Sequence, residues 1–132
     1  MTFEEIRAAV EVHVAAWTGA PIAFDGVPLS QDVIDAQEAR NPWVRLTIQH
    51  GDSFTAGIGA NPCVRRTGLI MVQIFTARDV GSRSAMLLAD SLAQHLEYYR
   101  SGELETLAAS VNRVGPSEGY YQVNLTVPFR AG

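Results

Sequence analysis

The sequence predicts one α+β domain over residues 1–132, in which a mainly antiparallel sheet of four to five strands carries two helices packed on one face. Two stretches place apolar residues at the three- and four-residue spacing of a helix, and other stretches alternate apolar and polar residues as strands do. The expected order is α-β-β-β-α-β-β. Runs of antiparallel strands separated by helices are typical of a sheet covered by helices on one side.

The first helix is expected from about residue 3 to residue 17. Thr2 is suited to cap its start, and Glu5 three residues later completes a capping box. One face of this helix is apolar, with Phe3, Ile6, Val10, Val14 and Trp17 at helical spacing. A glycine and a proline, Gly19 and Pro21, then end it.

Two weaker elements follow the first helix. Residues 21–24 form a short strand that ends at the turn-like pair Asp25-Gly26. The polar stretch 28–41 is interpreted as a loop with one helical turn around residues 33–39.

The middle of the chain predicts a hairpin with a long tip. Residues 43–50 alternate as a strand packed on one face, and the partner strand covers about residues 66–76. The tip between them, residues 51–63, is rich in glycine and is too long for a tight turn. We therefore expect a mobile arm that projects from the domain.

The strand at residues 69–75 is apolar on both faces. Ile70, Val72 and Ile74 match the core face, whereas Leu69, Met71 and Phe75 face away from it. Leaving each of these three in water would forgo about 1.5–3 kcal/mol of possible burial. Two explanations stay open: a neighbouring loop covers them, or they form a subunit interface.

The last third of the chain predicts one helix and two strands. Apolar residues keep helical spacing from about residue 82 to residue 99. Strands are expected near residues 105–114 and 120–129. Pro128 cannot donate to a strand ladder, which places it at a strand end or on an edge.

Composition excludes several classes of function. The net charge is −4, all ten basic residues are arginine, and no basic cluster exceeds the pair Arg65-Arg66. Tight binding of nucleic acid requires a more concentrated patch of positive charge.

The single cysteine, Cys63, cannot form an internal disulfide, and no apolar run is long enough to span a bilayer. The acidic N-terminal helix is unlike a targeting peptide, so a cytoplasm-like setting is expected.

No catalytic, metal or cofactor site is expected. His13, His50 and His95 lack the spacing of a metal site, and Cys63 has no histidine close in sequence. No serine lies in a nucleophile elbow. The glycines at 57 and 59 resemble part of a phosphate-binding loop, but a strand follows where that loop needs a helix. A small α+β enzyme or ligand-binding module remains the alternative to a protein that acts by assembly.

Several landmarks occur along most of the chain in a fixed order. They are Phe3-Glu4-Glu5-Ile6-Arg7-Ala8-Ala9-Val10, Trp43-Val44-Arg45-Leu46 leading into Gly51-Asp52, Arg65-Arg66-Thr67-Gly68 running into Met71-Val72-Gln73-Ile74-Phe75, Ala85-Met86-Leu87-Leu88-Ala89-Asp90-Ser91-Leu92, and Gly119-Tyr120-Tyr121-Gln122-Val123 with a terminal Val127-Pro128-Phe129. In this order the sequence resembles the tail terminator proteins of long-tailed bacteriophages, which gene transfer agents also use. Head-completion and other neck proteins share similar folds.

The resemblance implies a structural virion protein without a cofactor. Such proteins form a ring, typically hexameric, that caps the tail tube, ends its polymerisation and presents a surface to the head. The implied partners are other copies of the chain, the tail tube protein and the head–tail connector, with DNA only passing through the lumen and no membrane contact. The protein would be assembled in the bacterial host cytoplasm and reside in the virion tail.

Two features of the sequence fit the ring that the resemblance implies, the two-faced strand and the arm. The subunit interface would comprise Leu69, Met71, Phe75 and Trp43. The arm would contact the tail tube through Asp52, Phe54, Arg65 and Arg66, whose guanidinium groups form charge-assisted bonds to carboxylates.

Overall fold

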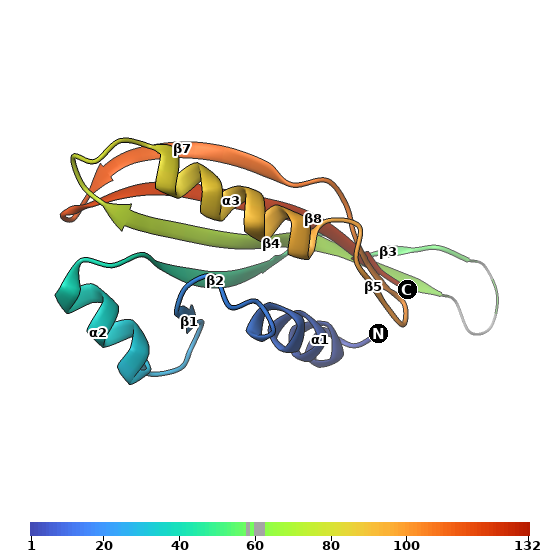
Figure 1. The fold of residues 1–132 in the computed structure, drawn as a ribbon. Coiled ribbons are helices and arrows are strands. Elements are labelled where there is room, and N and C mark those ends of the chain that lie inside the picture. Colours follow the sequence, from blue (N-terminus) through green and yellow to red (C-terminus); the bar gives the residue numbers. More distant parts are fainter. Residues whose placement is uncertain (58, 60–62) are drawn as a thin grey trace.

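The computed structural model describes residues 1–57, 59 and 63–132, which fold into three helices and eight strands (Figure 1). The helices are α1 (Phe3–Ala15), α2 (Gln31–Ala39) and α3 (Arg83–Leu96). The strands are β1 (Ile22–Phe24), β2 (Trp43–His50), β3 (Phe54–Thr55), β4 (Val64–Ala77), β5 (Arg100–Ser101), β6 (Leu104–Thr106), β7 (Ser110–Ser117) and β8 (Tyr120–Ala131). The predicted fold of two helices and four to five antiparallel strands is therefore wrong.

The sheet is mixed and curled. Its strands follow the order β1-β2-β4-β8-β6-β5, while β3 pairs with β4 and β7 pairs with β8. β1 runs parallel to β2, and the other pairs are antiparallel. The parallel pair arises because the segment containing α2 returns the chain to the starting end of β1, and a parallel pair needs a crossover of this kind.

The helix α2 replaces the predicted loop. The Ser30 side chain accepts a hydrogen bond from the Val33 amide at the start of the helix, and Arg40 ends it in the left-handed conformation at φ 59°. Only two of its residues, Val33 and Ala36, are buried. Because only these two positions are apolar and buried, the sequence of this polar segment shows a weak helical periodicity.

The main core lies between the sheet and the helices α1 and α3. Ile6, Val10 and Val14 of α1 meet the inward residues of β2, β4 and β8, and α3 adds Ala85, Ala89, Leu92 and Leu96. The predicted capping box at Thr2 and Glu5 is present. The helix ends at Ala15, but Trp17 still packs into the core and its Nε1 donates to Ser91 Oγ at 2.9 Å.

A second cluster occupies the opposite face of the sheet. It consists of Ala23, Val33, Ala36, Trp43, Phe75 and Tyr120, and α2 covers it. The sheet therefore carries helices on both faces, because α2 packs on the side that the prediction left open. In Figure 1, α2 lies at the end of the molecule opposite the β3–β4 arm.

The arm is a hairpin that extends from the body of the fold (Figure 1). Phe54 and Thr55 of β3 pair with Arg65 and Val64 of β4, and the Ala56 amide donates to the Cys63 carbonyl at 2.7 Å. The expected mobility of its tip concerns in part residues 58 and 60–62, which lie outside the described residues.

The strand predicted at residues 105–114 is two strands, β6 and β7, that pair with the same edge of β8. The ladder breaks beside Pro128, whose carbonyl accepts from the Leu107 amide at 2.9 Å. In a strand the amide and carbonyl of one residue point to the same edge, so the missing proline N–H removes one bond there. A register shift between Arg113 and Gly115 then bends β7.

Candidate assembly surfaces

The side of the sheet that faces away from α1 and α3 is only partly covered. We define the outer sheet face as the outward positions of the three long central strands, which the register aligns in rows: Arg45, Gln73 and Asn124; Thr47, Met71 and Thr126; Gln49, Leu69 and Pro128; Thr67 and Arg130; and Arg65. These residues are half-buried or exposed. α2 covers only the end of this side, at Trp43, Phe75 and Tyr120.

The four predicted interface residues divide into two pairs. Leu69 and Met71 are half-buried on the outer sheet face. Trp43 and Phe75 are buried, with 5% and 8% of their surface exposed, and their rings stack at 4.3 Å beneath α2. For Phe75 the covering segment is therefore the chain's own stretch 28–41, one of the two explanations that the sequence left open.

An arginine–aromatic hollow lies where α2 meets the outer sheet face. It has a volume of about 340 Å³ and is lined by Gln37, Arg40, Trp43, Arg45, Phe75, Ser117, Glu118 and Tyr120. The Arg45 guanidinium lies 5.2 Å from the Trp43 ring centre, and that of Arg40 lies 5.5 Å from the Tyr120 ring centre. This site could not be predicted from the sequence, because its residues come from distant segments that only the fold brings together.

A second depression, the arm-base groove, lies where the arm meets the outer sheet face. It is largely apolar, with a volume of about 490 Å³, and Phe54, Leu69, Leu107, Pro128 and Arg65 are among its lining residues. The structure thus brings Phe54 and Arg65, predicted for the arm, beside Leu69, predicted for the interface. Asp52 is exposed nearby, and its carbonyl accepts a hydrogen bond from Thr67 Oγ1 at 2.9 Å.

Arg65 and Arg66 point to opposite sides of β4, as successive strand residues do. Arg66 Nε donates to the Met1 carbonyl at 3.0 Å, and its guanidinium lies 4.2 Å from the Phe3 ring centre. This arginine therefore fastens the N-terminal segment to β4. Arg65 donates to the Gly132 carbonyl at 3.3 Å and lines the arm-base groove.

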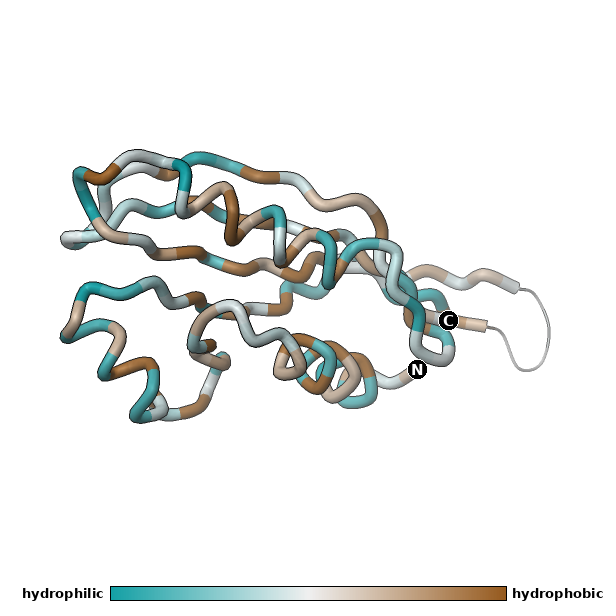
Figure 2. The backbone as a smooth tube through the Cα atoms, in the orientation of Figure 1, coloured by the Kyte–Doolittle hydropathy of each residue, from teal (hydrophilic) through white to brown (hydrophobic). Residues whose placement is uncertain are grey.

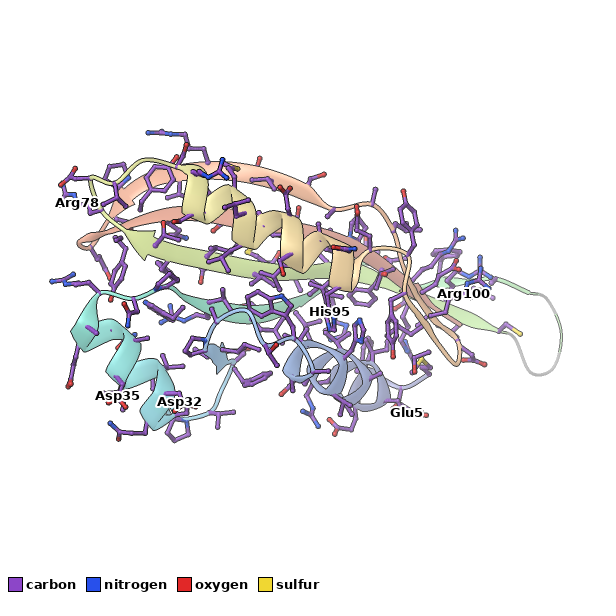
Figure 3. All side chains as sticks on the ribbon, viewed as in Figure 1. Glu5, Asp32, Asp35, Arg78, His95 and Arg100 are labelled. Atoms are coloured by element: carbon purple, nitrogen blue, oxygen red, sulfur yellow. The ribbon has the colours of Figure 1, made fainter. Side chains whose placement is uncertain are left out.

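The helices α1 and α3 are joined by a reciprocal pair of histidines. His13 Nε2 contacts the His95 carbonyl at 2.7 Å, and His95 Nε2 contacts the His13 carbonyl at 2.6 Å. Because a carbonyl only accepts, each Nε2 must carry a proton. Burial, followed by the neighbouring His95 charge, lowers the pKa of His13 below its ordinary value of 6.5, although the bond to the His95 carbonyl acts in the opposite direction. Figure 3 labels His95 within this interhelical contact.

The structure places the other residues that were considered for chemistry in different parts of the described chain. No group of three or more His, Cys, Asp or Glu residues there could hold a metal ion. His50 packs edge-on against Phe3 and Phe129, with ring centres 5.0 and 6.0 Å away. Cys63 is exposed at the end of the arm's paired region.

The family assignment follows from the sequence as a whole. The model of a family described as phage tail terminator protein matches residues 5–129. The chain belongs to the phage tail terminator protein family. The resemblance seen in its landmarks is thereby confirmed, and membership gives the chain a structural role in a virion tail and interactions with other tail or head proteins.

The fold is shared with solved structures. One of them matches with a TM-score of 0.73 at 18% identity, over 100% of this chain and 96% of the other. At this identity the likeness concerns the fold alone. The sequence matches no curated relative. No helix within the described ranges of the terminator chain has the length and hydrophobicity that crossing a bilayer requires.

Proposed function

We propose that this terminator-family chain forms a ring on the end of the tail tube, stops tube polymerisation and presents the surface that joins the head. The family match over residues 5–129 carries this proposal. A capping ring needs contacts with the next subunit and with the tube. The outer sheet face and the arm, which adjoin at Arg65, are the two surfaces that we assign to these tasks.

The arm is the part that contacts the tube in this proposal. Phe54 is 51% exposed although it is a large aromatic residue, and burial against a partner would stabilise a complex by about 1.5–3 kcal/mol. Arg65 and Asp52 flank it with opposite charges that can pair with charged groups on the tube. Arg66 contributes indirectly, because it holds the arm's base against the N-terminal segment.

Leu69 and Met71 form the apolar part of the subunit contact. They are adjacent outward positions on β4, and the polar side chains of Gln49, Thr47 and Thr126 border them. Trp43 and Phe75 contribute as the stacked floor of the neighbouring hollow. An interface with an apolar centre and a polar rim has this composition.

The capping activity can be tested with tail tube protein from the same particle, polymerised in the presence and absence of the chain. We expect the chain to produce tubes of limited length that carry a ring at one end in electron micrographs. Arg65→Glu should lengthen the tubes, whereas Arg78→Glu, at the far end of the molecule from the arm, should not (Figure 3). Tubes that grow to the same length with and without the parent protein would refute capping.

A further inference from the structure

Charge is distributed unevenly along the chain. Residues 1–38 hold seven of the fourteen acidic residues and only one of the ten basic residues. These residues lie in α1, β1 and α2, which surround the β1 edge of the sheet with α1 on one face and α2 on the other, and we call this region the acidic layer. It lies along the β2 side of the sheet in Figure 1. The acidic layer therefore carries a concentrated negative charge, while the rest of the protein has a small positive excess.

The acidic layer also exposes apolar side chains. Val12 on α1 is 73% exposed and Val27 after β1 is 56% exposed. They line a shallow depression together with Arg7, Ala8, Glu11, Ala15 and Phe24. In Figure 2 hydrophobic and hydrophilic residues alternate along the α1 helix. The charged lining of the depression is the ion-paired Arg7 and Glu11, while the carboxylate of Asp25, two residues before Val27, makes no ion pair to a described residue. An apolar depression in a region of negative net charge is suited to contact with a positively charged partner.

The outer sheet face has the complementary charge. Its outward positions on β2, β4 and β8 include Arg45, Arg65 and Arg130 but no acidic residue; the others are mainly amides, hydroxyls and the apolar pair Leu69 and Met71. Arg130 is neutralised by Glu105 of β6. Arg45 and Arg65 make no ion pair with any described residue.

The arginine–aromatic hollow is the part of this surface best suited to receive a carboxylate. Arg40 and Arg45 stand over its aromatic floor, and within the described ranges neither forms an ion pair. The Trp43 side chain is also buried in its wall, and no described group accepts a hydrogen bond from its Nε1. The Arg40 guanidinium makes one long bond, 3.5 Å to the Gly119 carbonyl, and Glu118 also lines the hollow without forming an ion pair to a described residue. Arg45 and the Trp43 Nε1 therefore remain the donors that an acceptor from outside the chain would satisfy.

We propose that the outer sheet face, centred on the arginine–aromatic hollow, binds the acidic layer of a second copy of the chain, which inserts a carboxylate between Arg40 and Arg45. The contacting part of the acidic layer, around Val12, Asp25 and Val27, is a different region of the subunit from the hollow. The contact is therefore head-to-tail and closes into a ring when the rotation between neighbours permits. Val12 and Val27 of one copy cover Leu69 and Met71 of the next. This inference rests on the proposed ring and supplies the surface that faces the predicted interface residues.

The contact can be tested with two variants that each damage one side. The double variant Arg45→Glu, Met71→Glu disrupts the outer sheet face. The double variant Val12→Arg, Asp25→Arg disrupts the acidic layer. Leu87→Arg with Asp90→Arg is the matched control for the second variant, because it changes one exposed apolar and one acidic residue on α3. Circular dichroism checks that each variant is folded, and sedimentation velocity at low ionic strength measures association.

We expect the parent and the control to associate beyond a dimer, and each damaged variant to stay monomeric. An equal mixture of the two damaged variants should form dimers and nothing larger, since it contains one intact pair of surfaces. Added salt should weaken association of the parent, because the contact is largely electrostatic. A parent that stays monomeric, an acidic-layer variant that associates like the parent, or a mixture that stays monomeric would each overturn the inference.

The result can be separated from a failure of the proposed function. A parent that forms rings but does not limit tube growth would refute capping and leave the head-to-tail contact intact. Conversely, an acidic-layer variant that caps tubes as well as the parent would refute the contact and leave capping intact.

Discussion

The histidine pair between α1 and α3 predicts a loss of stability in mild acid. Each histidine of the pair donates Nε2–H to the other's backbone carbonyl, and the His13 ring also stacks on Tyr99 with ring centres 3.5 Å apart. His13→Phe keeps an aromatic ring but removes one donor and one titrating group. The His95 carbonyl then loses its partner, which costs about 1–3 kcal/mol for a group away from water. We expect a decrease of that size in the free energy of unfolding at pH 7.5.

The pH dependence follows from the pKa of His13, which is lowered mainly by burial of the ring. The unfolded chain binds a proton at His13 near pH 6.5, whereas the folded chain binds it only at lower pH, so unfolding is favoured as the pH falls. The stability that neutral His13 contributes is therefore complete above pH 6.5 and is lost as the pH falls through the lower folded pKa. Hydrogen bonds to Arg7, Thr2 and Arg130 lower the pKa values of Glu4, Glu5 and Glu105 respectively. Protonation of these carboxylates affects stability only below pH 4.5, so it does not contribute between pH 7.5 and pH 5.5.

Urea unfolding followed by circular dichroism at pH 7.5 and pH 5.5 measures both effects. The parent should lose stability between these values, and His13→Phe should lose less. His50→Phe is the control, because it makes the same change at the exposed end of β2. If His13→Phe unfolded at the same urea concentration as the parent at pH 7.5, or kept the full pH dependence, the assigned role of the pair would be wrong.

Three further predictions concern stability. Ser30→Ala should lower the free energy of unfolding by about 1 kcal/mol, measured in urea, because α2 loses the side chain that accepts from the Val33 amide; an unchanged midpoint would contradict the cap. Gly68→Ala should destabilise the fold and lower the thermal midpoint, since a Cβ there would lie 2.4 Å from the Gln49 carbonyl oxygen and 2.6 Å from the Phe129 ring; Gly26→Ala, where φ is 75° but space is open, separates crowding from backbone strain. Ile74→Ala should cost about 2–5 kcal/mol in urea, whereas Met71→Ala should cost much less, because Ile74 is fully buried and Met71 is not; equal losses would place both residues in the core.

The elements with strong periodicity could be predicted from sequence. The capping box at Thr2 and Glu5, the alternation in β2 and the inward set on β4 all appear in the structure, because local pattern and tertiary burial agree there. The weak elements could not be predicted. α2 buries only Val33 and Ala36, and β5 and β6 have two and three residues, too few to show a period.

The candidate surfaces were predictable only in part. The two-faced strand pointed to Leu69 and Met71 correctly as outward residues, but Phe75, in the same alternation, is covered by α2. Arg65 and Arg66 form one basic pair in the sequence, but strand geometry directs their side chains to opposite sides of β4. The hollow combines Arg40, Arg45 and Tyr120, and no local pattern links residues whose proximity depends on the crossover through α2.

The two apolar clusters on opposite faces of the sheet give the protein a built-in pair of optical reporters. The chain has two tryptophans, and one lies in each cluster: Trp17 among α1, α3 and the sheet, and Trp43 under α2. Trp17→Phe and Trp43→Phe would leave one emitter on a chosen side. Emission from Trp43 alone would follow the detachment of α2, and emission from Trp17 alone would follow the opening of the helical side. A difference between the two unfolding curves would measure how far each side of the sheet can open by itself.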